Sequence, residues 1–170
     1  MEQNGWGPPA VDLNFLKSGL GVLKVVQMIL SLAGFIIAEV TAPPYGWEQM
    51  KAFEWISLTI FILTLAVFTT FLASWHKSEA VVRVNWPLVD FCHSALCTVL
   101  WSINLILALV ITSDYGPGDL LGAIIATVLA IISLVTFWAT VRMSYRRWHL
   151  FSPTPTIPYH YQHLGTEPYS

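Results

Sequence analysis

Four long apolar runs, separated by short polar segments, constrain this chain more than any other feature of its sequence. They cover about residues 19–42, 53–75, 86–112 and 120–141. A helix needs about 20 apolar residues to cross the hydrocarbon core of a bilayer, and each run is long enough. Because lipid cannot hydrogen-bond to the backbone, each run has to be helical there. The sequence therefore predicts an all-α integral membrane protein with four transmembrane helices.

The composition agrees with a lipid environment and narrows the functional classes. Charged residues form 11% of the chain and hydrophobic residues 55%, whereas a soluble domain carries about 25% charged residues. The length of 170 residues suits one domain. No basic patch is present that would neutralise nucleic-acid phosphates. Because phosphate-binding, metalloprotease and nucleophile motifs are also absent from the sequence, we expect neither catalysis nor a cofactor.

Lysine and arginine predict the orientation, because they favour the cytoplasmic side of a membrane. Lys51 falls on one side of the predicted bundle. The other seven basic residues fall on the opposite side: Lys17, Lys24, Lys77, Arg83, Arg142, Arg146 and Arg147. We therefore expect a cytoplasmic segment of residues 1–18, a membrane bundle of residues 19–141 and a cytoplasmic tail of residues 142–170. Both termini are thus predicted to be cytoplasmic.

Short connections force consecutive helices to lie side by side and antiparallel, which predicts a four-helix bundle. Small residues recur every fourth position on two of the helices: Gly34 and Ala38, and Gly122, Ala126 and Ala130. Such spacing lets helix backbones approach closely. We interpret these residues as packing positions within the bundle, rather than as a specific dimer face.

A lysine and an aspartate lie just inside the cytoplasmic ends of the first and third runs. Lys24 and Asp90 are predicted at matching depths, so they can pair across the bundle. A structural tie, or a lysine that reaches back to the headgroups, is favoured over a proton or ion relay. His93 shares a helix face with Asp90, but one carboxylate and one histidine are too few ligands for a metal site.

Two further sets of polar residues fall within or beside the membrane. Glu39 and Glu54 flank the first outer loop, where two carboxylates either bind a cation, share a proton or remain hydrated at the interface. We favour hydrated groups. Gln27 and Asn104 are expected to donate hydrogen bonds between helices.

The tails carry two candidate signals. Residues 153–170 contain four prolines and few aliphatic residues, which predicts a disordered tail. Within it, Tyr161 is followed three places later by Leu164, a spacing that resembles a clathrin-adaptor sorting signal. At the other end, Asp12 is placed to cap a short helix that leads into the first run.

Several segments resemble the MARVEL-domain proteins. Residues 12–17 (DLNFLK), 21–27 (GVLKVVQ) and 35–39 (FIIAE) resemble their first helix. Residues 53–55 (FEW) resemble the start of their second helix, and 84–91 (VNWPLVDF) the start of their third. The resemblance covers roughly residues 12–145. It is strongest to the chemokine-like-factor-like MARVEL transmembrane proteins, with plasmolipin and the MAL proteins more distant.

The resemblance implies a four-span protein with both ends cytoplasmic and no catalysis. It also implies work in vesicle traffic, in membrane apposition or in stabilising partner membrane proteins, at the plasma membrane and in endosomal vesicles. Expected partners are membrane lipids, other integral membrane proteins and clathrin adaptors. The sequence leaves open whether the protein also forms a homo-oligomer. Two alternatives rest on other features: the intramembrane charges allow a small ion, proton or solute transporter or channel, and the four-span topology allows a supporting role at cell junctions.

Overall fold

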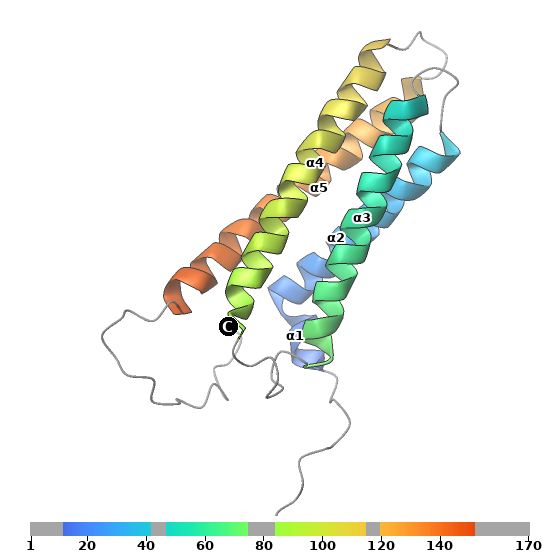
Figure 1. Ribbon diagram of the computed structural model, residues 1–170. Coiled ribbons are helices and arrows are strands. Elements are labelled where there is room, and N and C mark those ends of the chain that lie inside the picture. Colours follow the sequence, from blue (N-terminus) through green and yellow to red (C-terminus); the bar gives the residue numbers. More distant parts are fainter. Residues whose placement is uncertain (1–11, 42–46, 75–83, 115–119, 152–170) are drawn as a thin grey trace, which may run out of the picture.

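The computed structural model describes residues 12–41, 47–74, 84–114 and 120–151, and these segments are helical apart from caps and turns. Five helices follow one another along the chain: α1 Leu13–Lys17, α2 Gly19–Val40, α3 Trp47–Leu72, α4 Trp86–Asp114 and α5 Leu120–Phe151 (Figure 1). Each of the four long helices is long and apolar enough to cross a membrane. The predicted all-helical fold with four spans is confirmed.

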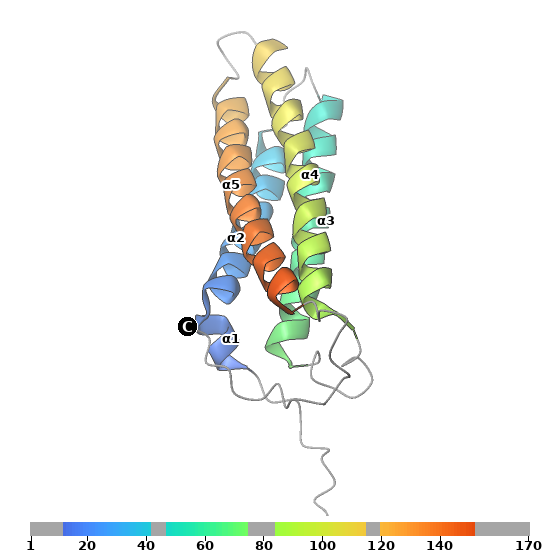
Figure 2. The same ribbon diagram turned by 90° about the vertical axis from the view of Figure 1, so that its left-hand side faces the viewer.

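The four long helices form an antiparallel bundle (Figures 1 and 2). The most extensive contacts are between α4 and α5 and between α2 and α3, and the α3–α4 and α2–α5 contacts close the ring. Helices α2 and α4 are therefore diagonal partners. The end that carries α1, together with the start of α4 and the end of α5, is called the basic end here, because Lys17, Arg142 and Arg146 are exposed there.

Two helices extend beyond the apolar runs that mark them in the sequence. Helix α3 begins at Trp47 rather than near residue 53, and α5 continues past residue 141 to Phe151. A run of apolar residues indicates membrane depth, whereas a helix continues for as long as its residues support it, and arginine is a good helix former. Residues 142–151 are therefore the last turns of α5.

Helix α1 is a single capped turn folded beneath the bundle. The Asp12 carboxylate accepts hydrogen bonds from the backbone N–H of Asn14 (3.1 Å) and Phe15 (3.0 Å), as an N-cap residue does. The Asp12 N–H donates to the carbonyl of Leu72 at the end of α3 (2.8 Å). Phe15 is buried against Phe68 and Phe71. These contacts fix the direction in which the chain enters the membrane.

Glycine allows the turn between α1 and α2. A methyl group added at Gly21 would lie 2.1 Å from the Phe15 carbonyl oxygen, a distance that no side chain can occupy. At Gly19 the same methyl group would make an ordinary contact with Met143, 3.9 Å away. The close approach of α1 and α2 therefore depends on Gly21 and not on Gly19.

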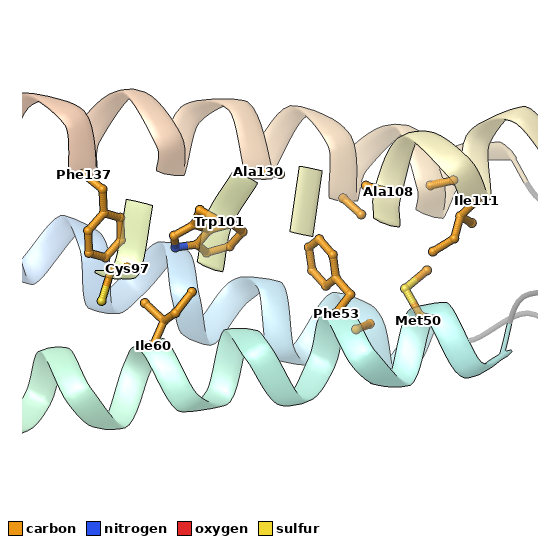
Figure 3. Packing of buried hydrophobic residues seen from close by; sticks show 12 residues of the cluster. Met50, Phe53, Ile60, Cys97, Trp101, Ala108, Ile111, Ala130 and Phe137 are labelled. Carbon is orange, nitrogen blue, oxygen red and sulfur yellow. The ribbon is translucent and has the colours of Figure 1, made fainter. Parts of the chain in front are cut away.

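The apolar core lies along the middle of the bundle (Figure 3). Trp101 is the largest fully buried side chain, and its ring meets that of Phe53 edge-on, with centroids 6.1 Å apart. Gly34 leaves room for it, since an added methyl group would lie 3.3 Å from the indole. The same methyl group would lie 3.1 Å from Ser57 on α3 and 3.1 Å from Leu129 on α5. All four long helices therefore meet around Gly34.

The distribution of polarity is the reverse of that in a soluble bundle. Only 22% to 33% of the most apolar window of each long helix is buried inside the molecule. The outward faces carry exposed apolar side chains, among them Ile29, Ile62, Ile106, Val128 and Val135. The inward faces carry fully buried polar side chains: Lys24, Gln27, Ser31, Ser57, Thr64, Ser94, Asn104, Ser133 and Thr140. Such a surface is stable in lipid, where helix association depends on packing and polar contacts rather than on hydrophobic burial.

Candidate functional site

An ion pair crosses the interior of the bundle near the basic end. Lys24 Nζ on α2 lies 2.8 Å from Asp90 Oδ1 on α4, and the two side chains are 0% and 3% exposed. Because α2 and α4 are diagonal partners, only a long side chain can join them. The structure thus brings together the two residues that the sequence predicted at equal depth. Lys24 does not reach the headgroups, since its ammonium is buried.

Three more side chains surround this pair. The Lys24 ammonium lies 3.2 Å from His93 Nδ1 and donates to Ser94 Oγ at 3.4 Å. Ser144 on α5 donates to the other carboxylate oxygen of Asp90. We refer to Lys24, Asp90, His93, Ser94 and Ser144 as the buried polar cluster. It ties α2, α4 and α5 together at one depth.

The donor pattern determines the histidine tautomer. An ammonium group has no acceptor, so His93 must offer its Nδ1 lone pair to Lys24. The proton of the neutral ring then sits on Nε2, which lies 3.5 Å from Cys97 Sγ. The imidazole therefore bridges the ion pair and a buried thiol.

The energetics of this cluster favour a structural role. Removing one partner of a buried ion pair costs about 3–5 kcal/mol, because a charge is left without compensation in a medium of low dielectric constant. Here each charge faces an opposite charge and at least one further polar side chain. The cluster holds three helices in register.

Sequence reasoning found part of this cluster and missed the rest. His93 follows Asp90 by three positions, and the sequence placed both residues on one face of α4. Ser94, four positions after Asp90, carries the same periodic signal but was not singled out. Ser144 had no such signal, because which face of α5 meets Asp90 is decided by packing between the helices.

Two amides form further interhelical contacts deeper in the bundle. Gln27 on α2 donates to Thr140 Oγ1 on α5 (2.7 Å), and Asn104 on α4 donates to Ser57 Oγ on α3 (3.0 Å). Both residues act as the interhelical donors that the sequence indicated. Each amide oxygen lacks a protein partner, as do Trp101 Nε1 and Ser133 Oγ among the described buried atoms.

The two carboxylates at the opposite end share a lysine. Lys51 Nζ lies 2.6 Å from Glu39 Oε2 and 2.7 Å from Glu54 Oε2. The cation between the carboxylates is thus the ammonium of Lys51, a partner that sequence reasoning did not assign. Of the two carboxylates that we expected to be hydrated, Glu39 has a side chain that is 57% exposed, whereas that of Glu54 is 8% exposed. Helix α3 carries Lys51 and Glu54 on one face, because they are three positions apart.

The small residues occupy helix contacts. Gly34, Ala38, Ala126 and Ala130 are buried, the three alanines at 0%, 1% and 0% exposure in that order. A methyl group on Gly122 would lie 2.7 Å from Thr41 Cβ, so this glycine lets α5 pack closely against the end of α2.

Two other sequence predictions concern metals and the tail. Within residues 12–41, 47–74, 84–114 and 120–151, no three or more His, Cys, Asp or Glu side chains gather as metal ligands. Tyr161 and Leu164 lie outside the residues that the structure describes.

An antiparallel bundle of four apolar helices, with polar ties inside and apolar side chains outside, defines an integral multi-pass membrane protein with four spans. This architecture fits a MARVEL-like tetraspanning protein. Sequence comparison agrees with this class. The chain is 26% identical to human plasmolipin over 144 residues, which cover 81% of this chain and 75% of plasmolipin. Rat plasmolipin is 25% identical over the same shares of the two chains.

A relative other than plasmolipin covers a similar share of the chain. Human proteolipid protein 2 is 26% identical over 128 residues, which cover 75% of this chain and 74% of that protein. No family model matches the chain, and no solved structure gives a significant match. The particular subgroup that the sequence motifs favour stays a prediction.

Proposed function

We propose that the protein is a non-enzymatic organiser of membranes that acts in vesicle traffic, in membrane apposition or in the stability of partner membrane proteins. One observation carries this proposal: the intramembrane charges are paired with one another, while the outward faces of the helices are apolar. Such a bundle offers side-chain surface to lipids and to the transmembrane helices of partners. Its action is therefore lateral, within the plane of the membrane.

The proposed location is the plasma membrane and endosomal vesicles, and the tail carries the proposed sorting signal. Tyr161 and Leu164 have the spacing of a signal that clathrin adaptors bind as an extended segment. Other integral membrane proteins are the proposed cargo, and self-association remains part of the proposal.

Proximity labelling tests this function, with the labelling enzyme fused to the C-terminus. We expect wild type to enrich adaptors and a small set of membrane proteins, and Tyr161→Ala to lose the adaptors. Tyr159→Ala is the matched control, because the residue three places after Tyr159 is Gln162 rather than a bulky apolar residue. An unselected neighbourhood that neither substitution changes would contradict the proposal.

The unpartnered polar atoms inside the bundle favour a second candidate, a small ion, proton or solute transporter or channel. Gln27 Oε1 and Ser133 Oγ are buried without a protein partner, as are atoms of Trp101 and Asn104. In a channel these groups would contact water or a permeating ion. Flux through reconstituted vesicles decides between the candidates: a channel loses conductance in Asp90→Asn, whereas an organiser shows no flux in wild type and loses only stability in the variant.

A further inference from the structure

A shallow groove lies on α5 at the basic end. It has a volume of about 350 Å³ and is lined by Ala139, Arg142, Met143 and Arg146. Arg142 and Arg146 are four positions apart, so both project from the same side of the helix. Ala139 and Met143 supply its apolar lining, and Met143 lies next to the start of α2 at Gly19. The groove therefore combines two guanidinium groups with an apolar lining.

The groove lies at the depth of the lipid headgroups. Arg142 follows the start of α5 at Leu120 by 22 residues. At about 1.5 Å per residue this is about 33 Å, close to the thickness of a hydrocarbon core. An aromatic cluster gives the same depth: Tyr145 and Trp148 on α5 pack with Phe91 on α4 at this level. Such rings prefer the membrane interface.

The positive charge of the groove is not neutralised by the described part of the protein. Neither arginine has a carboxylate within ion-pair distance among the described residues. The described acidic side chains at this end have other partners. Asp90 is buried with Lys24 and Ser144, and Asp12 caps α1. The groove thus leaves two guanidinium groups for an external anion.

The apolar surface next to the groove identifies the kind of anion. Val135, Ala139, Arg142 and Arg146 follow one another at spacings of three or four residues, so one face of α5 runs from the arginines into the membrane. Val135 is 63% exposed on that face, and Val128 further along is 50% exposed. A soluble phosphate would use only the arginines. A phospholipid would use both parts, with its phosphate on the guanidinium groups and an acyl chain along the apolar face.

We propose that Arg142 and Arg146 form a binding site for one anionic phospholipid of the membrane leaflet that contacts the basic end. Arginine suits phosphate because its planar fork donates two parallel hydrogen bonds. The site does not depend on the trafficking role, because it follows from the charge and shape of α5.

Native mass spectrometry of the full chain in neutral detergent tests the site. Phosphatidylserine is titrated against phosphatidylcholine with the same acyl chains, and inorganic phosphate is added as a soluble competitor. We expect phosphatidylserine to bind more tightly than phosphatidylcholine, with inorganic phosphate unable to displace it. Arg142→Gln and Arg146→Gln are each expected to weaken the binding of phosphatidylserine about fivefold.

Two further variants separate a defined groove from diffuse charge. Arg147→Gln removes the same charge from the next position on α5, which does not line the groove, and we expect less than a twofold change. Ala139→Leu enlarges a lining residue of the groove without changing charge, and it should weaken the binding of phosphatidylserine as the arginine variants do. Thermal unfolding verifies that each variant is folded.

The proposal is overturned by any of three results. Equal losses in Arg146→Gln and Arg147→Gln, with no effect of Ala139→Leu, mean that the charge acts diffusely. Displacement of the lipid by inorganic phosphate means a site for free anions. Equal binding of phosphatidylcholine means that the arginines do not select the ligand.

Discussion

At the scale of single residues, the stability of the bundle depends most strictly on the buried polar cluster, where a charge needs its partner. Lys24 and Asp90 are separated by more than sixty positions in the sequence, yet their charged groups lie 2.8 Å apart inside the bundle. A buried charge without its partner is costly, whereas two apolar replacements of similar volume are often tolerated. Each charge of the pair therefore compensates the other. A double substitution that replaces both residues distinguishes such a structural pair from a functional proton or ion relay.

Lys24→Met alone is expected to lower the free energy of unfolding by about 3–5 kcal/mol, because Asp90 loses its counter-charge. The double variant Lys24→Met/Asp90→Leu should recover most of that loss. Unfolding of the purified protein in detergent, followed by circular dichroism, measures both. Lys17→Met, on the exposed side of α1, is the control and should change little. A double variant as unstable as the single one would show that the two residues do not act as a pair.

At the scale of elements, α1 and α2 form a tight unit that depends on one glycine. Gly21→Ala would place its methyl group against the Phe15 carbonyl, so α1 must move away and Phe15 must leave Phe68 and Phe71. Burial of a phenylalanine contributes about 1.5–3 kcal/mol. We expect backbone amides of residues 15–18 to exchange hydrogen about tenfold faster or more.

The matched control for this change is Gly19→Ala, where the added methyl group makes an ordinary contact. Hydrogen exchange with mass spectrometry measures both variants in the same detergent. Unchanged protection of α1 in Gly21→Ala would mean that α1 does not pack as the structure shows.

At the scale of the whole molecule, orientation in the membrane follows from charge. Seven of the eight basic residues belong to the predicted cytoplasmic side, and the exposed arginines of α5 lie at the basic end. We expect a cysteine at position 48, on the exposed Glu48 of α3, to react with an impermeant maleimide on intact cells. A cysteine at position 149, on the exposed His149, should react only after permeabilisation.

The background for this labelling replaces Cys92 and Cys97 with serine, and the cysteine-free chain is the blank. Labelling of position 149 on intact cells, with position 48 protected, would reverse the predicted topology. It would also assign the proposed lipid site to the outer leaflet.

Much of the architecture could be read from the sequence, because it depends on local composition. Residues of high hydropathy in runs of about 20 have to form helices in lipid, and short connections make neighbours antiparallel. The depth of Lys24 and Asp90 followed from counting along two helices, since each residue adds about 1.5 Å. The face shared by Asp90 and His93 followed from the helical period.

The tertiary structure decided which residues meet across the bundle. Ser144 donates a hydrogen bond to Asp90, and Lys51 lies between Glu39 and Glu54. Both contacts exist because packing between the helices fixes which face of each helix points into the bundle. Periodicity does not specify that face when every face of a helix is apolar enough for lipid. The sequence alone thus determined that the chain crosses a membrane four times, and only the close packing around Gly34 and Trp101 decided which polar groups are paired inside it.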